Sequence, residues 1–292
     1  MSYKNGIDIS AYQGSPDFSK LKNKVDFVIL RAGYGRYTDQ KDKSFERNYS
    51  ECRKHGIPVG AYWFSYAVTP ADAKREALAC AEVLKGKKLE YPVYFDVEGK
   101  SLVNKATVSA MCEAFCGELE KQGWFAGIYM SRSPAQTMLT EQTASRYALW
   151  LAEYGTSLNW SGAVGMWQNS STGRVSGISG NVDTDICYVD YPTIIKAGGF
   201  NGFSPECGRV LDTEGLEKGG RGDGVLAYKL LLKLADKAGI ITAKVDDNGI
   251  FGEGTLRATN SYLKKMGYEE NGIAGEKLMK MLYSDVEKTI AK

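Results

Sequence analysis

The chain has 292 residues, enough for one large domain followed by a small one. Its 43% hydrophobic and 25% charged residues are ordinary for a globular protein, and a net charge of +2 argues against a nucleic-acid binder held by a basic surface. The single histidine, His55, would have to serve any Ser-His-Asp triad, Cys-His dyad or zinc site. Those reaction classes are therefore nearly excluded, and we expect His55 to end a helix before Gly56.

The N-terminal residues are polar, and no run of about 18 apolar residues occurs in the chain. We therefore expect a protein made in the cytoplasm without a classical signal peptide and without membrane insertion. The six cysteines are scattered along the sequence, and we expect them to be free thiols.

Five apolar runs open the chain, and each is followed by a segment with helical periodicity. The expected strands are 6–10, 27–31, 58–64, 92–96 and 125–129, and the expected helices are 17–24, 43–54, 70–84, 105–122 and 134–139. Three more strands, at 148–152, 165–168 and 182–189, have only short connections between them. This alternation predicts an α/β fold with right-handed crossovers, and eight strands suffice to close a barrel. The functional face of such a barrel lies at the C-terminal ends of its strands.

The pattern changes at Lys196. Residues 196–208 are rich in glycine and are expected to form a linker. Three segments with helical periodicity follow, at 224–239, 255–266 and 276–283, separated by glycine-rich turns. We therefore expect a first domain over 1–195, a linker over 196–208 and a small all-α domain over 209–292.

Two carboxylates, Asp96 and Glu98, stand at the end of the fourth expected strand. Residues two apart in a strand point to the same face, so these side chains would project side by side. Two carboxyl groups in one pocket move their pKa values apart, so that one can stay protonated while the other stays charged. Cleavage of a glycosidic bond needs such a pair. For an isolated pair, a strand running into a solvated loop is the alternative.

Seven motifs carry a resemblance to a known family. In chain order they are Gly6–Gly14, Arg31–Gly35, Gly60–Phe64, Phe95–Glu98, Trp150–Tyr154, Met166–Gln168 and Val182–Asp185. Together they resemble the glycoside hydrolase family 25 lysozymes over roughly residues 3–192. The resemblance implies an irregular (β/α)5(β)3 TIM-like barrel. It also implies an N-acetylmuramidase that cuts the β-1,4 bond between N-acetylmuramic acid and N-acetylglucosamine in bacterial peptidoglycan.

The resemblance also assigns roles to four acids. Glu98 matches the general acid and Asp96 its neighbouring carboxylate, while Asp8 and Asp183 match the acids of the first and last strands. Asp96 would stabilise positive charge or orient the substrate's N-acetyl group, and the sequence leaves substrate-assisted and direct attack both open. The family often has Asn where this chain has Asp185, whose added charge we expect outside the centre of the pocket.

Four further residues are expected to line the sugar groove, and for each aromatic residue among them core packing is the alternative. They are Tyr62, Tyr129, Trp150 and Gln168. We expect no cofactor and no metal site. Residues 246–249 have the wrong ligand spacing for a calcium loop and are expected to form a turn.

The tail resembles a three-helix peptidoglycan-binding domain over about residues 209–283, through Gly222–Val225, Val245–Gly252 and Asn271–Gly275. That family usually has Gln where this chain has Tyr228 and Leu263-Lys264, so ligand contacts are not carried over. Two functions stay open. One is an endolysin-like or autolysin-like muramidase that acts on the cell wall after release. The other is a carbohydrate-binding or scaffolding protein with little turnover, whose tail self-associates. The Asp96–Glu98 pair favours the first, because a pure binder needs no acid of raised pKa.

Overall fold

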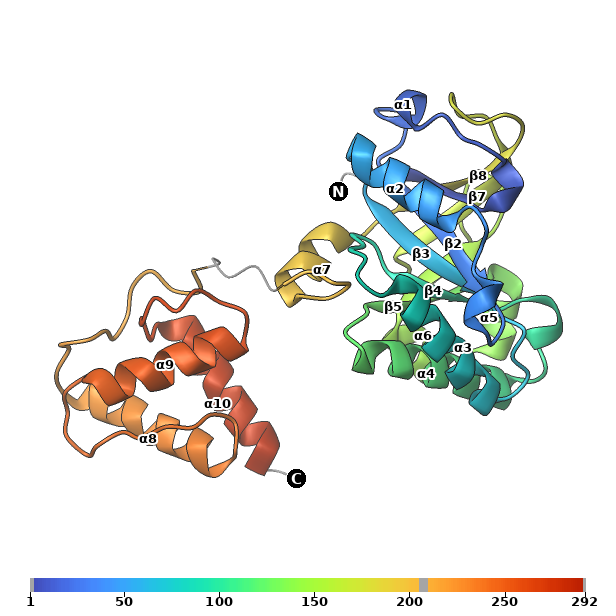
Figure 1. The fold of residues 1–292 in the computed structure, drawn as a ribbon. Helices are drawn as coiled ribbons and strands as arrows, with labels where there is room; N and C mark the ends of the chain where they lie inside the picture. The colour runs from blue at the N-terminus through green and yellow to red at the C-terminus, as the bar shows by residue number, and fades with distance from the viewer. Residues whose placement is uncertain (1–2, 205–209, 291–292) are drawn as a thin grey trace. The chain divides into compact units, whose positions relative to one another are not determined.

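The computed structural model describes residues 3–204 and 210–290, and the chain divides between Phe203 and Ser204 into two compact units (Figure 1). We call them the barrel unit and the C-terminal unit. Within the described residues, no helix is both long and apolar enough to cross a membrane.

Eight strands form a closed barrel in the barrel unit, in chain order. They are β1 (Lys4–Ile9), β2 (Phe27–Tyr34), β3 (Val59–Phe64), β4 (Val93–Asp96), β5 (Ala126–Ser131), β6 (Ala148–Ala152), β7 (Met166–Gly173) and β8 (Val182–Cys187). Neighbouring strands from β1 to β7 are parallel, and β8 closes the barrel antiparallel to both β7 and β1. The expected α/β barrel of five β/α units and three further strands is confirmed.

Helices cover the outside of the first five strands. They are α1 (Phe18–Leu21), α2 (Phe45–His55), α3 (Pro70–Leu84), α4 (Lys105–Lys121), α5 (Arg132–Met138) and α6 (Glu141–Arg146). Capping residues in the sequence explain where these helices begin and end. The Thr69 side chain caps α3, whose first residue is a proline, and His55 ends α2 before Gly56 in the left-handed conformation. Helix α6 is an addition to the expected set.

The barrel is filled by large side chains. Trp150 of β6 lies at its centre, with its ring centroid 4.5 Å from that of Tyr129 and 5.1 Å from that of Tyr94. Gly6 leaves room for the Phe27 ring, because a Cβ atom at Gly6 would lie 2.3 Å from it. A second apolar layer packs between strands and helices. The five cysteines within the described residues are buried and free.

The expected linker begins too early. Helix α7 spans Tyr191–Gly198, and the buried Asn201 binds the barrel through its side chain. The Asn201 amide donates to the carbonyls of Leu89 and Tyr91, at 3.1 and 2.8 Å, and its oxygen accepts from the Phe125 N–H at 2.7 Å. The barrel unit therefore extends to Phe203, and residues 205–209 of the expected linker lie outside the described residues.

The C-terminal unit contains three helices, α8 (Asp223–Lys237), α9 (Glu253–Lys265) and α10 (Glu276–Ile290), around its own apolar core. Tyr228 and Leu263 belong to this core, with 2% and 1% of their surface exposed. The expected turn at 246–249 is held by the buried Lys229, whose ammonium group contacts the Asp246 carboxylate and donates to the Asn248 carbonyl at 2.9 Å. A lysine therefore occupies the centre of this acidic turn.

Candidate active site

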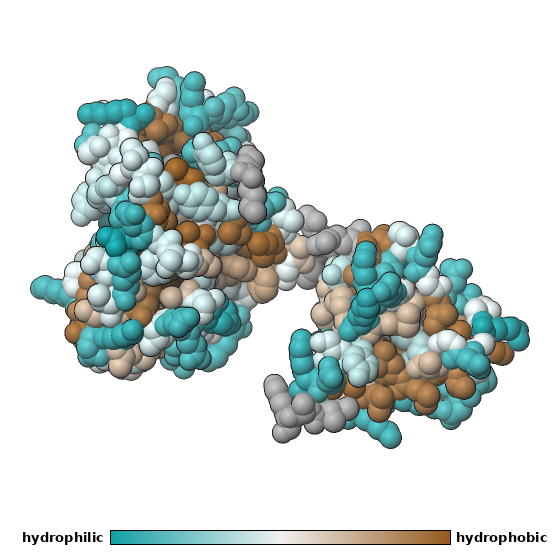
Figure 2. Space-filling view, turned by 180° about the vertical axis from the view of Figure 1, so that it is seen from behind, coloured by the Kyte–Doolittle hydropathy of each residue, from teal (hydrophilic) through white to brown (hydrophobic). Residues whose placement is uncertain are grey.

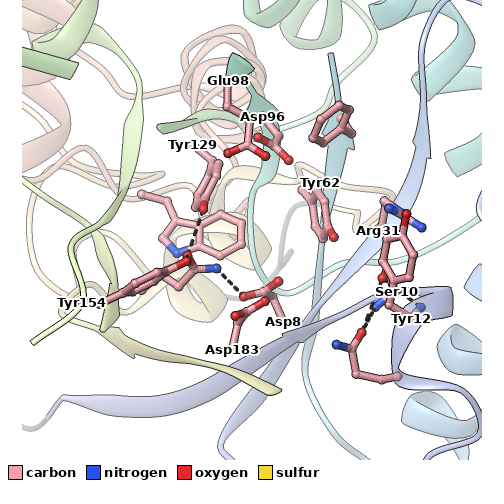
Figure 3. A pocket seen from close by; sticks show the side chains of 14 residues that line it. Asp8, Ser10, Tyr12, Arg31, Tyr62, Asp96, Glu98, Tyr129, Tyr154 and Asp183 are labelled. Atoms are coloured by element: carbon pink, nitrogen blue, oxygen red, sulfur yellow. Dashed lines mark hydrogen bonds between the residues drawn. The ribbon is translucent and has the colours of Figure 1, made fainter. Parts of the chain in front are cut away.

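A pocket of about 260 Å³ lies at the C-terminal ends of the parallel strands (Figure 3), and each of the eight strands contributes a side chain to it. In strand order these are Asp8, Arg31, Tyr62, Asp96, Tyr129, Trp150, Gln168 and Asp183. Glu98, which follows β4, also lines it. All eight residues that the sequence singled out therefore meet in one pocket.

Asp183 reaches the pocket from the beginning of a strand, because β8 runs opposite to its neighbours. The start of β8 therefore lies at the same face as the ends of the others. The pairing sets Asp183 directly opposite Asp8 of β1. Like charges directly opposite each other on paired strands destabilise a sheet. The Asp8–Asp183 pair therefore costs stability.

Asp96 is the more deeply buried of the two acids at the end of β4. Burial raises the pKa of Asp96 well above its usual range, and the charges of Glu98 and Asp8 raise this pKa further. Arg31 acts against them and lowers the pKa of Asp96. Among the described residues, Asp96 Oδ1 has no hydrogen-bond partner although it is buried. A buried polar atom without a partner is unusual in a protein and is typical of a functional position.

Glu98 is half-buried at the mouth of the same pocket. Burial and the charge of Asp183 raise its pKa. A carboxyl group whose pKa is raised can hold a proton close to neutral pH and deliver it to a substrate oxygen. Glu98 and Asp96 project from the same end of β4 (Figure 3), as their spacing in the sequence predicts.

Gln168 links Tyr129 of the pocket to Asp8 through two hydrogen bonds. Its Oε1 accepts a hydrogen bond from Tyr129 Oη at 2.9 Å, and its Nε2 donates to Asp8 Oδ2 at 2.8 Å. Burial raises the pKa of Asp8 well above its usual range and the charge of Asp183 adds to this effect, whereas the bond from Gln168 lowers it. The tyrosine fixes the orientation of the amide, and the amide fixes that of Asp8.

Asp185 lies outside the lining of the pocket, as expected, but it is buried beneath it. Its Oδ1 accepts from Trp150 Nε1 at 2.9 Å, and its Oδ2 has no partner within the described residues. Burial and the charges of Asp8 and Asp183 raise the pKa of Asp185 well above its usual range. The added acid therefore sits in the barrel interior, where Asn would keep the same bond to Trp150.

The aromatic residues combine the two roles that the sequence left open. Tyr62, Tyr129 and Trp150 all line the pocket; Tyr129 and Trp150, 8% and 1% exposed, also belong to the barrel core, and Tyr62 packs against that core. Sequence reasoning missed six lining residues, which lie within or beside the family motifs. They are Ser10, Tyr12, Gln13, Arg31, Phe64 and Tyr154. Arg31 could have been recognised from the sequence, because it is a charged residue within an otherwise apolar strand.

This arrangement combines four acids of raised pKa with aromatic walls and one arginine, a set suited to proton transfer at a neutral, ring-shaped ligand. Within the described residues, no group of three or more His, Cys, Asp or Glu side chains is placed to hold a metal ion.

Known proteins share sequence and fold with this chain. Residues 7–178 match the family described as Glycosyl hydrolases family 25, a stretch that includes Asp8, Asp96 and Glu98 and ends before Asp183. The chain is 31% identical to the autolytic lysozyme of Clostridium acetobutylicum over 183 residues, which are 62% of this chain and 54% of that protein. This chain thus spans about half the length of that curated relative.

Two solved structures are similar. The modular autolysin LytC of Streptococcus pneumoniae superposes with a TM-score of 0.58 at 30% identity, over 64% of this chain and 47% of its own. The CTP1L endolysin aligns over 98% of this chain and 99% of its own, with a TM-score of 0.59 at 22% identity.

Proposed function

The chain belongs to glycosyl hydrolase family 25, and from this premise we propose that it is a lysozyme that cleaves bacterial peptidoglycan. The bond cut is the β-1,4 linkage between N-acetylmuramic acid and N-acetylglucosamine. The pairing of Asp96 with Glu98, in a pocket built from all eight strands, carries this proposal. The structure of LytC, a similar protein, is known in complex with a synthetic peptidoglycan ligand.

Glu98 serves as the general acid in this proposal. It stands at the mouth of the pocket, where burial and the charge of Asp183 raise its pKa. Glu98 therefore holds a proton and passes it to the leaving glycosidic oxygen. Burial and the charges of Glu98 and Asp8 raise the pKa of Asp96, and Arg31 offsets only part of this effect. In this proposal the positive charge that develops on the sugar ring favours the charged form of Asp96, whose carboxylate stabilises that charge and orients the N-acetyl group.

Asp8 and Asp183 complete the acidic wall. Beside burial, the charge of Asp183 raises the pKa of Glu98 and so helps it to keep its proton, whereas the charge of Asp8 raises the pKa of Asp96. Tyr62, Tyr129 and the Trp150 edge form the wall against which a sugar ring packs, and Gln168 holds Asp8 in place.

Digestion of purified cell walls tests this function. We expect turbidity to fall and mass spectrometry to find new reducing ends on muramic acid. New amino termini would instead indicate an amidase or peptidase. Wall binding without soluble products would favour the alternative of a binding or scaffolding protein with little turnover.

The C-terminal unit is proposed to bind the cell wall, so that the barrel acts on peptidoglycan outside the membrane after release. The unit has its own core, and its helices and glycine-rich turns follow the order of the resemblance. A wall-binding unit raises the local concentration of the barrel at the polymer.

One observation favours a second role for this unit, self-association. Hydrophobic residues gather on its surface, on the right of Figure 2. A groove between α8 and α10 is lined almost entirely by apolar atoms, and Leu230, Leu234 and Tyr283 around it are 55%, 45% and 59% exposed. Sedimentation of the isolated unit, with and without cell walls, separates the two roles.

A further inference from the structure

A second hollow of about 500 Å³ adjoins the active-site pocket, and Tyr12, Arg31 and Phe64 line both. We call this second hollow the annex. Its volume falls within the range of roughly 300–1,000 Å³ that is usual for ligand pockets. In Figure 3, Arg31 and Tyr12 lie together on the side of the active-site pocket away from Tyr129 and Tyr154. The annex therefore extends the active-site pocket on the side of β2.

The annex is walled by aromatic rings that the protein core does not bury. Tyr12 and Tyr66 are 85% and 54% exposed. Tyr66 packs edge-on against Phe64 and Tyr34, with ring centroids 5.3 and 6.0 Å apart. The Arg31 guanidinium lies 4.9 Å from the Tyr12 ring. A cluster of exposed aromatic residues beside a pocket is typical of a binding surface.

The charge of the annex is positive. Its lining holds Arg31, Lys41 and Lys43 against the single carboxylate of Asp42. Asp42 is 3% exposed and is fully engaged, because both Arg31 Nε and Arg31 Nη2 contact its Oδ2 at 2.7 Å and the N–H of Ser44 donates to its Oδ1 at 2.8 Å. The two lysines are therefore left without a carboxylate in the lining.

Outside the lining, the lysines are only weakly compensated. Lys41 lies 3.2 Å from the Glu46 carboxylate, which is exposed and also binds Lys87 at 2.8 Å. Lys43 is exposed and has no ion pair within the part of the chain that the structure describes. An exposed ammonium group beside an aromatic wall is free to pair with an anion.

Two adjoining hollows thus carry opposite charge. The active-site pocket holds four acids, and the annex holds an excess of two cations in its lining. A glycan with neutral sugar rings and an anionic branch fits both hollows in one orientation only. Its ring lies in the acidic pocket and its branch lies in the annex. Opposed charges of this kind favour orientation and selection more than raw affinity.

We propose that the annex binds a carboxylate-bearing branch of the glycan while a sugar ring occupies the active-site pocket. This inference rests on the proposed function, which supplies the glycan. Muramic acid offers two sources of such a carboxylate: its own lactyl group, where no peptide is attached, and the peptide stem, where one is. Lys41 and Lys43 pair with the carboxylate, and Tyr12 and Tyr66 pack against the branch.

The test uses the full chain with Lys41→Met and Lys43→Met combined. Its matched control combines Lys85→Met and Lys121→Met, which remove the same charge at the ends of α3 and α4, on the face opposite the pocket. Three soluble glycans serve as substrates: peptide-free strands, strands with peptide stems whose carboxylates are free, and the same peptide-bearing strands after amidation of those carboxylates.

The measured quantity is the ratio of KM for each charged glycan to KM for the amidated glycan. Because the lysines pair with the carboxylate, the annex variant should raise this ratio by about 3–10-fold, the size of two exposed charge contacts. Salt at about 0.5 M should remove most of the difference between variant and parent. The control variant should leave the ratio as in the parent. A change confined to one charged glycan identifies the lactyl group or the stem as the source.

An unchanged ratio on both charged glycans, or an equal change in annex variant and control, overturns the proposal. The same ratio measured as Kd by calorimetry, in a Glu98→Gln background, needs no turnover. Absence of turnover in the parent would count against the proposed function, whereas a Kd ratio insensitive to Lys41 and Lys43 would count against the annex alone.

Discussion

Asp8 and Asp183 lie directly opposite each other across the antiparallel pairing of β1 and β8. Burial is the larger cause of the raised pKa of both Asp8 and Glu98, and the charge of Asp183 raises both further. The strand pairing that closes the barrel therefore also contributes to the proton affinity of the proposed general acid.

The first prediction concerns this coupling. Asp183→Asn removes one negative charge, so the pKa of Glu98 should fall toward its usual value. Because the acid must be protonated to act, the alkaline limb of the kcat/KM profile should move to lower pH. The midpoint of this limb is read from the shape of the profile, independently of the absolute rate. A limb that stays in place, as expected for the exposed control Asp39→Asn, would contradict the coupling.

The second prediction concerns the acid itself. Glu98→Gln keeps the size of the side chain and removes its proton, so the rate on cell walls should fall by about 10²–10⁴. Circular dichroism and the melting temperature should match those of the parent. Glu141→Gln, at an exposed position in the first turn of α6, is the control and should retain full activity. A Glu98→Gln rate within a few-fold of the parent would show that another group delivers the proton.

The third prediction concerns stability at Glu76 of α3, which is 1% exposed and whose Oε1 accepts from the Tyr66 N–H at 2.9 Å. Burial raises the pKa of Glu76 from 4.5 to about 7. Between these values the unfolded chain loses its proton first, so the free energy of unfolding falls as pH rises and stays low above pH 7. Glu76→Gln removes this dependence and should stabilise the protein by about 1–3 kcal/mol at pH 8, with little effect at pH 4.

Urea denaturation at the two pH values measures this difference, and Glu82→Gln, on the exposed side of the same helix, is the control. An equal effect of Glu76→Gln at both pH values would mean that its carboxyl group does not titrate in this range.

The fourth prediction concerns Asn201. Asn201→Ala leaves the carbonyls of Leu89 and Tyr91 and the N–H of Phe125 without their partner, which should cost about 2–4 kcal/mol of unfolding free energy. Asn201 also has a positive φ of 53°. Asn23, exposed and at φ 69°, is the control for this backbone cost alone, and Asn23→Ala should cost about 1 kcal/mol or less. Equal losses at the two positions would assign the effect to the backbone.

The fifth prediction concerns the two units. A chain ending at Phe203 keeps the whole barrel unit and should hydrolyse small soluble muropeptides as the parent does, while binding intact walls more weakly. A chain ending at residue 195 loses Asn201 and should be markedly less stable. The isolated C-terminal unit should sediment with cell walls. If it forms oligomers and ignores walls, the unit serves in assembly.

Much of the barrel is predictable from local sequence. Strands such as β4 and β6 are apolar on both faces because helices or the barrel interior cover each side, and their short length follows from the turns that bound them. The spacing of Asp96 and Glu98 alone places both at one strand end. These features depend on neighbours in the chain.

Other features depend on contacts between distant segments and leave little local signal. The reversed direction of β8, which brings Asp183 to the pocket, is set by pairing with β1 and β7. Arg31 lies in an apolar strand, and its partner Asp42 comes from a loop eleven positions on. Asn201 looks like a linker residue because it stands among glycines, yet its partners lie more than 70 positions earlier.

Asn201 also fixes where the chain leaves the barrel unit. Its side-chain partners Leu89, Tyr91 and Phe125 immediately precede β4 and β5, at the N-terminal ends of these strands, whereas the pocket opens at their C-terminal ends. The exit point and the pocket therefore occupy opposite faces of the barrel. Up to Phe203, the last segment of the barrel unit thus leaves the mouth of the pocket open to a glycan strand.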